Sequence, residues 1–149
     1  MFNRLMILVV MVAVMDGCVT YRDINHEGLS SLTQHYEQFD LKLAWDVAAV
    51  GESTKITGAV TSVRYNRMYD LELWVSVLDN NGKTVARSVS SMNELKLNDT
   101  VPFSMTLPVA ATPGAKLRFT YKYKSSDGGG MSGEQMMQSF DTMIPISKF

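Results

Sequence analysis

Cys18 is the only cysteine in the chain and the residue whose position says most about chemistry. It follows an N-terminal segment in which Arg4 supplies a positive charge, residues 5–15 are all apolar, and Gly17 is small. A charged start, a short apolar run and a small residue before the cleavage point are typical of a secretory signal. A thiol placed directly after such a signal predicts a lipid attachment site.

Residues 15–18, Met-Asp-Gly-Cys, resemble the end of bacterial lipoprotein signal peptides, which runs aliphatic, small, Gly or Ala, Cys. Gly17 and Cys18 fit this pattern, whereas Asp16 departs from it. The resemblance implies cleavage before Cys18 and attachment of acyl chains, two or more of which anchor a protein stably to a membrane. In a Gram-negative host, Val19 implies sorting to the outer membrane, with the domain facing the periplasm.

Two other outcomes stay open for this segment. Eleven apolar residues rise only about 16 Å as a helix, against a hydrocarbon core of about 30 Å, so an uncleaved spanning helix is disfavoured. Ordinary signal cleavage would leave Cys18 a free thiol that could pair only between chains.

The two histidines do not suggest a metal site or a catalytic base. His26 and His35 are nine residues apart and lie in a polar segment before the expected domain, whereas helical metal ligands favour a spacing of four. The chain has no Gly-x-Ser-x-Gly elbow, and its cysteine directly follows the signal, where lipid attachment is expected. We therefore expect no enzyme activity, no metal and no cofactor.

A glycine-rich connection is the candidate partner-binding loop. It runs from residue 125 to 134 and lacks both the Lys-Ser or Lys-Thr ending and the following helix of a phosphate loop. Such a hairpin tip either recognises a partner or simply connects two strands. The residues proposed for contact are Ser125, Asp127, Gly128, Gly129, Gly130, Met131 and Glu134.

Methionines near this loop offer an alternative chemistry. Met131, Met136, Met137 and Met143 carry thioethers, which bind Cu(I). Methionine also fills irregular gaps in cores, and no His or Cys accompanies this group, so core packing is the favoured interpretation.

A row of basic residues is a third candidate binding site. Lys116, Arg118, Lys122 and Lys124 have the spacing that places side chains on one face of a strand. The row could meet lipid headgroups, an anionic glycan or an acidic protein. The favoured interpretation is a solvated face whose lysines discourage edge-to-edge pairing.

Length and composition bound the fold. About 130 residues remain after cleavage of the 149, which suits one domain. The net charge of −1 gives no signal for nucleic acid, and one cysteine allows no internal disulfide, so packing alone must hold the fold. We divide the chain into a signal peptide (1–17), a lipidated N-terminus and tether (18–38) with a short helix allowed by apolar residues at 29, 32, 36 and 39, and a domain (39–149).

Period-two alternation of apolar residues dominates the domain. It predicts about seven strands, at 39–48, 55–65, 69–78, 83–91, 101–107, 116–124 and 139–146, with a bulge near Thr61 and a hairpin turn at 79–82. Strands at this spacing without a helical period indicate an immunoglobulin-like antiparallel β-sandwich whose core suits Trp45 and Trp74. A small antiparallel barrel is the alternative.

Four short runs resemble the FxLYD type of extracytoplasmic domain found in bacterial lipoproteins. The runs are 56–60 (Ile-Thr-Gly-Ala-Val), 71–79, 81–85 (Asn-Gly-Lys-Thr-Val) and 101–103 (Val-Pro-Phe). The element that names the family appears here as Val-Ser-Val-Leu-Asp at 75–79, and Asn98-Asp99 stand where the family has Pro-Gly. The resemblance implies an immunoglobulin-like fold and no established catalytic activity.

Together these features predict a membrane-anchored, noncatalytic module that binds an envelope protein or takes part in envelope assembly. The contacts are expected from the loop at 125–135 and from exposed strand edges. The alternative is an envelope ligand binder, with copper bound through methionines or an anionic glycan as its ligand.

Overall fold

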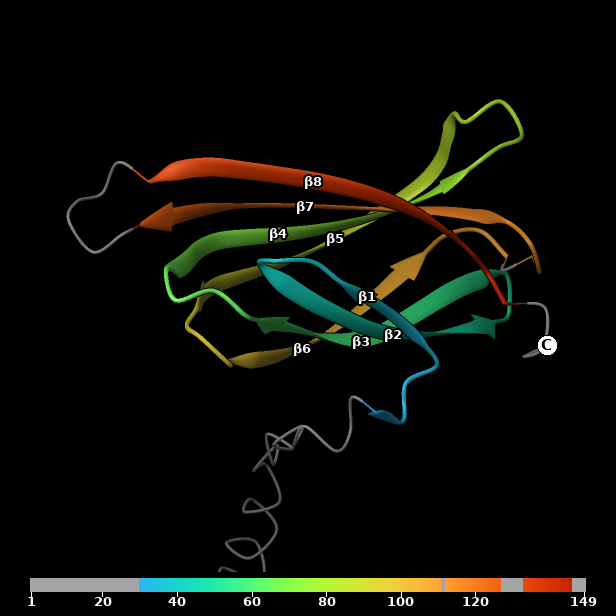
Figure 1. The fold of residues 1–149 in the computed structure, drawn as a ribbon. Coiled ribbons are helices and arrows are strands. Elements are labelled where there is room, and N and C mark those ends of the chain that lie inside the picture. Colours follow the sequence, from blue (N-terminus) through green and yellow to red (C-terminus); the bar gives the residue numbers. More distant parts are fainter. Residues whose placement is uncertain (1–29, 111, 127–132, 146–149) are drawn as a thin grey trace, which may run out of the picture.

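The computed structural model describes residues 30–110, 112–126 and 133–145 (Figure 1). The signal segment, Cys18, and the middle of the glycine-rich connection lie outside these residues. Within them, no helix has both the length and the apolar character needed to cross a bilayer.

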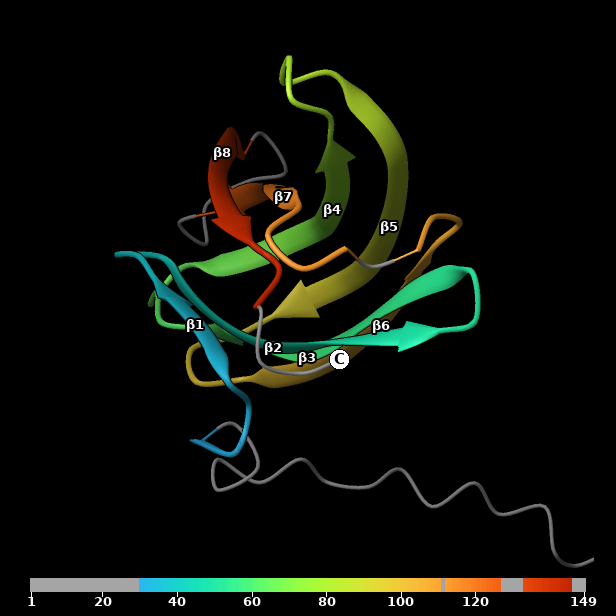
Figure 2. The same cartoon turned by 90° about the vertical axis from the view of Figure 1, so that its right-hand side faces the viewer.

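The described chain forms two antiparallel sheets of four strands each. The strands are β1 (Gln34–Glu37), β2 (Leu41–Val50), β3 (Ser53–Ser62), β4 (Arg67–Leu78), β5 (Thr84–Leu95), β6 (Thr100–Leu107), β7 (Lys116–Ser126) and β8 (Glu134–Met143). The first sheet has the order β1-β2-β3-β6 and the second the order β5-β4-β7-β8. Figure 2 shows the two sheets as separate layers, so the sandwich prediction is confirmed and the barrel alternative is wrong.

A short strand that the sequence did not predict precedes the expected domain. Gln34–Glu37 pairs with the β2 residues from Lys42 to Trp45. The ring of Tyr36 stacks on that of Phe140 in β8, with centroids 3.6 Å apart and planes inclined by 9°. Tyr36, one of the apolar residues at helical spacing, therefore anchors an edge strand to the opposite sheet.

The expected bulge near Thr61 is wrong. β3 pairs in regular register with β2 and β6, and it ends at Ser62. Val63 and Tyr65, whose parity suggested the bulge, belong to the connection that follows. The structure instead has an irregularity in β4, where three residue steps from Tyr69 to Glu72 face two steps on β7.

Asp70 is the extra residue of the β4 bulge and has a φ of 51°. The bulge shifts the alternation, so Met68 and Leu71 both point into the core while Tyr69 is only half-buried. β8 also differs from expectation, because it begins at Glu134 instead of residue 139.

The centre of the core is aromatic. Trp45 is 2% exposed, and its ring lies 4.7 Å from that of Phe119 and 5.9 Å from that of Phe140. Gly58 faces Trp45, and a Cβ there would lie 2.2 Å from the Ala44 carbonyl oxygen. Trp74, also expected in the core, lies half-buried on the outer face of its sheet beneath the Arg87 guanidinium.

Replacing Trp45 by alanine tests the role of the aromatic centre. We expect Trp45→Ala to lower the free energy of unfolding by about 3–5 kcal/mol, because the cavity opens between both sheets. Urea denaturation followed by circular dichroism measures this loss. Val50→Ala, at a residue 55% exposed on the same strand, is the control and should change stability by less than about 0.5 kcal/mol. Equal losses of stability in Trp45→Ala and Val50→Ala would contradict the placement of Trp45 at the centre of the core.

Candidate functional site

Four pairs of strand ends meet at one end of the sandwich. Because successive strands run antiparallel, β1, β3, β5 and β7 end there and β2, β4, β6 and β8 begin there, at the left of Figure 1. Ser125 and Glu134, the described residues of the predicted partner-binding loop, lie at this end. β1 runs toward this end, so Gln34, through which the chain enters the sandwich, lies farther from it than Glu37 does.

The structure pairs the two described residues proposed for that loop, Ser125 and Glu134, across β7 and β8. Ser125 belongs to β7 and is 7% exposed, with its hydroxyl unpaired among the described residues. Glu134 is the exposed first residue of β8. Residues 127–131, with Asp127, the three glycines and Met131, lie outside the described chain. Ser125 is therefore a core residue, and only Glu134 of the described pair faces solvent.

A buried polar cluster lies beneath the connections. Asp40 is fully buried and accepts hydrogen bonds from Tyr121 (3.0 Å) and Tyr123 (2.9 Å) of the opposite sheet. Arg64 donates to the Tyr123 hydroxyl at 3.1 Å, and the Asp40 carbonyl accepts from the amide of Val63. The cluster thus joins the connections after β1 and β3 to the middle of the second sheet.

Burial controls the titration of the two tyrosines. It raises the pKa of Tyr123 to about 12; Arg64 opposes this rise and the negative charge of Asp40 supports it. Burial, with Asp40 second, raises the pKa of Tyr121 still further. Both phenols therefore remain protonated donors at neutral pH.

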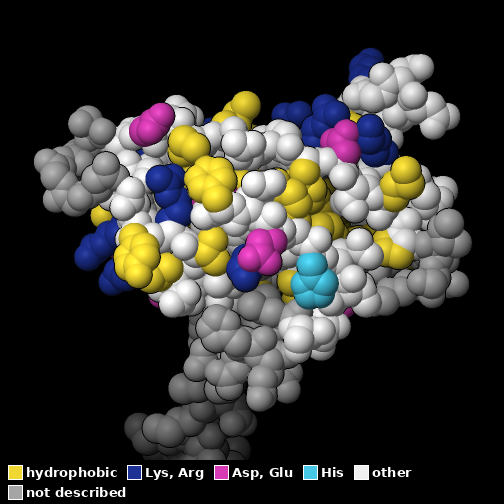
Figure 3. All heavy atoms as spheres, viewed as in Figure 1, with side chains coloured by type: hydrophobic (Ala, Val, Ile, Leu, Met, Phe, Trp, Pro, Cys, Tyr) yellow, Lys and Arg dark blue, Asp and Glu magenta, His cyan; other side chains and the backbone are white. Residues whose placement is uncertain are grey.

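Two aromatic side chains and one cation stand above this cluster. Phe39 is 61% exposed, and the Arg64 guanidinium lies 5.8 Å from the centre of its ring. Tyr65 follows Arg64 and is 91% exposed. We call Phe39, Arg64 and Tyr65 the loop-end surface. At the same end of the molecule, Figure 3 shows hydrophobic side chains next to Lys and Arg side chains.

Sequence reasoning missed this surface. The expected first strand began at Phe39, which would have put its side chain in the core, but β2 begins at Leu41. Tyr65 was placed in a strand that ends at Ser62. The available signal was Asn66, because a turn-forming residue after Tyr65 favours a connection there.

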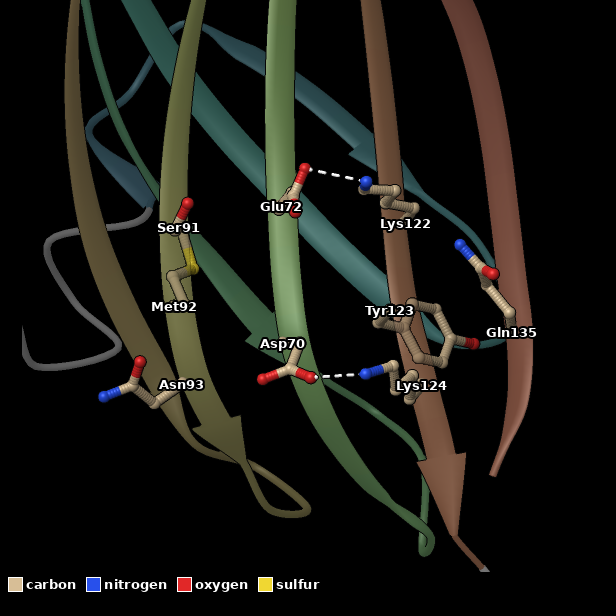
Figure 4. Close-up of a pocket in the computed structure, with 9 residues that line it drawn as sticks. All are labelled: Asp70, Glu72, Ser91, Met92, Asn93, Lys122, Tyr123, Lys124 and Gln135. Carbon is tan, nitrogen blue, oxygen red and sulfur yellow. Dashed lines mark hydrogen bonds and ion pairs between the residues drawn. The ribbon is translucent and has the colours of Figure 1, made fainter. Parts of the chain in front are cut away.

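A hollow lies on the outer face of the second sheet, beside the β4 bulge (Figure 4). It has a volume of about 340 Å³ and spans all four strands of that sheet. Asp70 faces Lys124 at 2.9 Å, and Glu72 faces Lys122 at 3.0 Å, across β4 and β7. Ser91 and Asn93 from β5 and Gln135 from β8 complete the walls. We call this the sheet-face groove.

The basic row on β7 is matched by carboxylates. Its ion pairs are Lys116 and Arg118 with Asp141, Lys122 with Glu72, and Lys124 with Asp70. Hydrogen bonds from Arg118, and then Lys116, hold the pKa of Asp141 well below its usual range. β7 lies between β4 and β8, so its lysines do not protect a free edge as expected. The row is a ladder of ion pairs on a central strand.

The methionines that the structure describes do not converge. Met136 packs partly buried against the core, while its neighbour Met137 is 66% exposed on the opposite face of β8. Met143 lies six residues beyond Met137, about 20 Å along the strand. Among the described residues, no group of three His, Cys, Asp or Glu could hold a metal ion.

Comparison with known proteins bears on the fold alone. No family model and no curated protein matches the chain. The GAE domain of GGA2p from Saccharomyces cerevisiae superposes with a TM-score of 0.55 at 14% identity, covering 75% of this chain and 96% of that one. The putative ApaA protein from Bordetella pertussis gives 0.51 at 12% identity, covering 79% and 99%. These similarities show an immunoglobulin-like β-sandwich.

Asp40→Asn tests the buried cluster. An amide offers one acceptor oxygen in place of two, so we expect a loss of about 1–3 kcal/mol in the free energy of unfolding. Both tyrosines should also ionise at lower pH, because the negative charge that helps to raise their pKa is gone. Phenolate absorbance during an alkaline titration measures that change.

The wild type supplies the reference for this titration. Tyr123 has a higher pKa folded than the ordinary value of 10, so its contribution to stability is complete below pH 10 and is lost as the pH rises through 12. Glu52→Gln, which removes an exposed carboxylate from the opposite end, should leave the late-ionising phenols unchanged. An Asp40→Asn protein with the wild-type titration would contradict the cluster's role.

Proposed function

We propose that this protein is a membrane-anchored extracytoplasmic lipoprotein whose β-sandwich binds a protein partner without catalysis. The observation that carries the proposal is the loop-end surface, where Phe39 and Tyr65 are 61% and 91% exposed beside Arg64. Aromatic residues and Arg are enriched among the side chains that contribute most to protein binding. Tyr65 buries almost no area within the domain, so packing inside the domain does not explain why an aromatic residue stands at this position.

The support beneath this surface also favours recognition. Asp40 is the neighbour of Phe39, and Arg64 is held by Tyr123, whose hydroxyl is in turn held by Asp40. Side chains that are ordered before binding lose less conformational freedom when a partner docks. The buried cluster thus holds the Arg64 guanidinium in place over the Phe39 ring before a partner binds.

The direction of β1 suits an anchor at the N-terminus. The chain enters the sandwich at Gln34 and then runs toward the loop end, so the loop-end surface lies beyond the far end of β1 from the entry point. Residues 19–33 would span up to about 50 Å if extended. An anchor at Cys18 would therefore allow the loop-end surface to meet a partner beyond the lipid surface.

The alternative ligands from the sequence have less support. Copper binding through methionines needs convergence, which Met136 and Met137 do not have. An anionic glycan would have to compete with the carboxylates that already pair with the basic row.

Cys18→Ser tests the anchor. We expect the wild type in the membrane fraction with an N-terminal mass that includes acyl chains, and the variant in the soluble extracytoplasmic fraction. Membrane fractionation and mass spectrometry of the N-terminal peptide measure both. A wild-type mass without acyl chains would reject the lipoprotein proposal.

Site-specific photo-crosslinking in the native host tests the surface. A photoreactive amino acid in place of Tyr65 should yield one partner, identified by mass spectrometry, and the yield should fall in an Arg64→Ala background. The control is the same amino acid in place of Val85, which is 54% exposed near the other end of the sandwich. Crosslinks at position 85 alone would reject the loop-end surface, and the absence of crosslinks at both positions would reject protein binding.

A further inference from the structure

We propose that the sheet-face groove binds an uncharged, hydroxyl-rich ligand of the size of a sugar ring, such as one unit of a neutral glycan. This site is separate from the loop-end surface, and the proposal does not depend on protein binding. Its volume of about 340 Å³ is at the lower end of the range for small-molecule sites.

The bulge in β4 builds the groove. Asp70 is inserted between Tyr69 and Leu71 with a φ of 51°, a backbone conformation that costs energy in a residue with a side chain. The insertion puts Asp70 beside Lys124, two residues along β7 from Lys122. Two acid and base pairs therefore stand side by side across β4 and β7, as Figure 4 shows.

The charges in the groove cancel. Asp70 and Glu72 supply two carboxylates, and Lys122 and Lys124 supply two ammonium groups at 2.9–3.0 Å from them. A ligand with a net charge would have to break one of these pairs to find a counter-charge. A neutral ligand leaves both pairs in place.

Within the part of the chain that the structure describes, each carboxylate keeps a free acceptor. The interactions of Asp70 use Oδ2, and those of Glu72 with Lys122 and with the Trp74 indole N–H both use Oε2. Asp70 Oδ1 and Glu72 Oε1 therefore remain able to accept. Hydroxyl groups suit such a surface because each can donate to a carboxylate and accept from an ammonium group.

The two sides of the groove add further polar groups that can form hydrogen bonds with hydroxyls. Asn93 and Ser91 on β5 and Gln135 on β8 present amide and hydroxyl groups that make no hydrogen bond within the described chain. An amide offers both donors and acceptors, which matches neighbouring hydroxyls on one ring. Polar side chains contribute most of the named walls, so an apolar ligand would find little surface to bury.

The test is a titration of the full-length protein in detergent with neutral oligosaccharides: chitotriose, maltotriose and mannotriose. A heparin tetrasaccharide is the charged comparison. Calorimetry measures binding, and tryptophan fluorescence locates it, because Trp74 donates to Glu72 at the groove whereas Trp45 is buried in the core. We expect at least one neutral sugar to bind saturably, with a Kd on the order of 1 mM.

Substitutions place the binding in the groove. Asn93→Ala and Gln135→Ala should each weaken binding about fivefold, as expected for the loss of one hydrogen bond. Gln138→Ala is the matched control, since Gln138 is exposed on the same strand but points to the other face. This variant should bind as the wild type does.

Three results would overturn the proposal. They are no saturable binding of any of the neutral sugars up to about 10 mM, tighter binding of the heparin tetrasaccharide, or equal losses in Gln135→Ala and Gln138→Ala. None of them would affect the protein-binding proposal, which is tested at Tyr65.

Discussion

The buried carboxylate of Asp40 constrains this sandwich more than any other polar group in the described chain. Removing a carboxylate from water is costly unless hydrogen bonds replace the lost hydration. Here the hydroxyls of Tyr121 and Tyr123 supply them from the opposite sheet. The two sheets must therefore keep one relative position at this end. Apolar packing of Trp45 and Phe119 tolerates small shifts better than these directional contacts do.

The same constraint connects the two proposed surfaces. Tyr123 points inward to Asp40, while its neighbours Lys122 and Lys124 point outward into the sheet-face groove. Arg64 reaches the Tyr123 hydroxyl from the loop-end surface. One short stretch of β7 thus positions side chains for both surfaces, and a shift of this strand would alter both at once.

Alternating hydrophobicity was sufficient to predict an antiparallel all-β domain, because long strands with one buried face repeat at period two. It favoured a sandwich but left a small barrel open. It could not predict the bulge at Asp70, which is a backbone property of one residue. It also placed Asp40 on a polar face beside Lys42, although Asp40 precedes β2 and turns inward. The ion pairs of the groove depend on the register between β4 and β7, about fifty residues apart in the chain, and periodicity within a strand carries no such information.

β1 is tied to both sheets, which its four residues alone would not suggest. β1 is an edge strand, paired only with β2 in the described chain, yet Tyr36 stacks on Phe140 of the other sheet. Phe140 in turn packs on Phe119 and Trp45. With an anchor at Cys18, tension on the tether would reach both sheets through this aromatic contact as well as through the β1 ladder. If the proposed anchor is present, this short edge strand would not bear the load on its backbone hydrogen bonds alone.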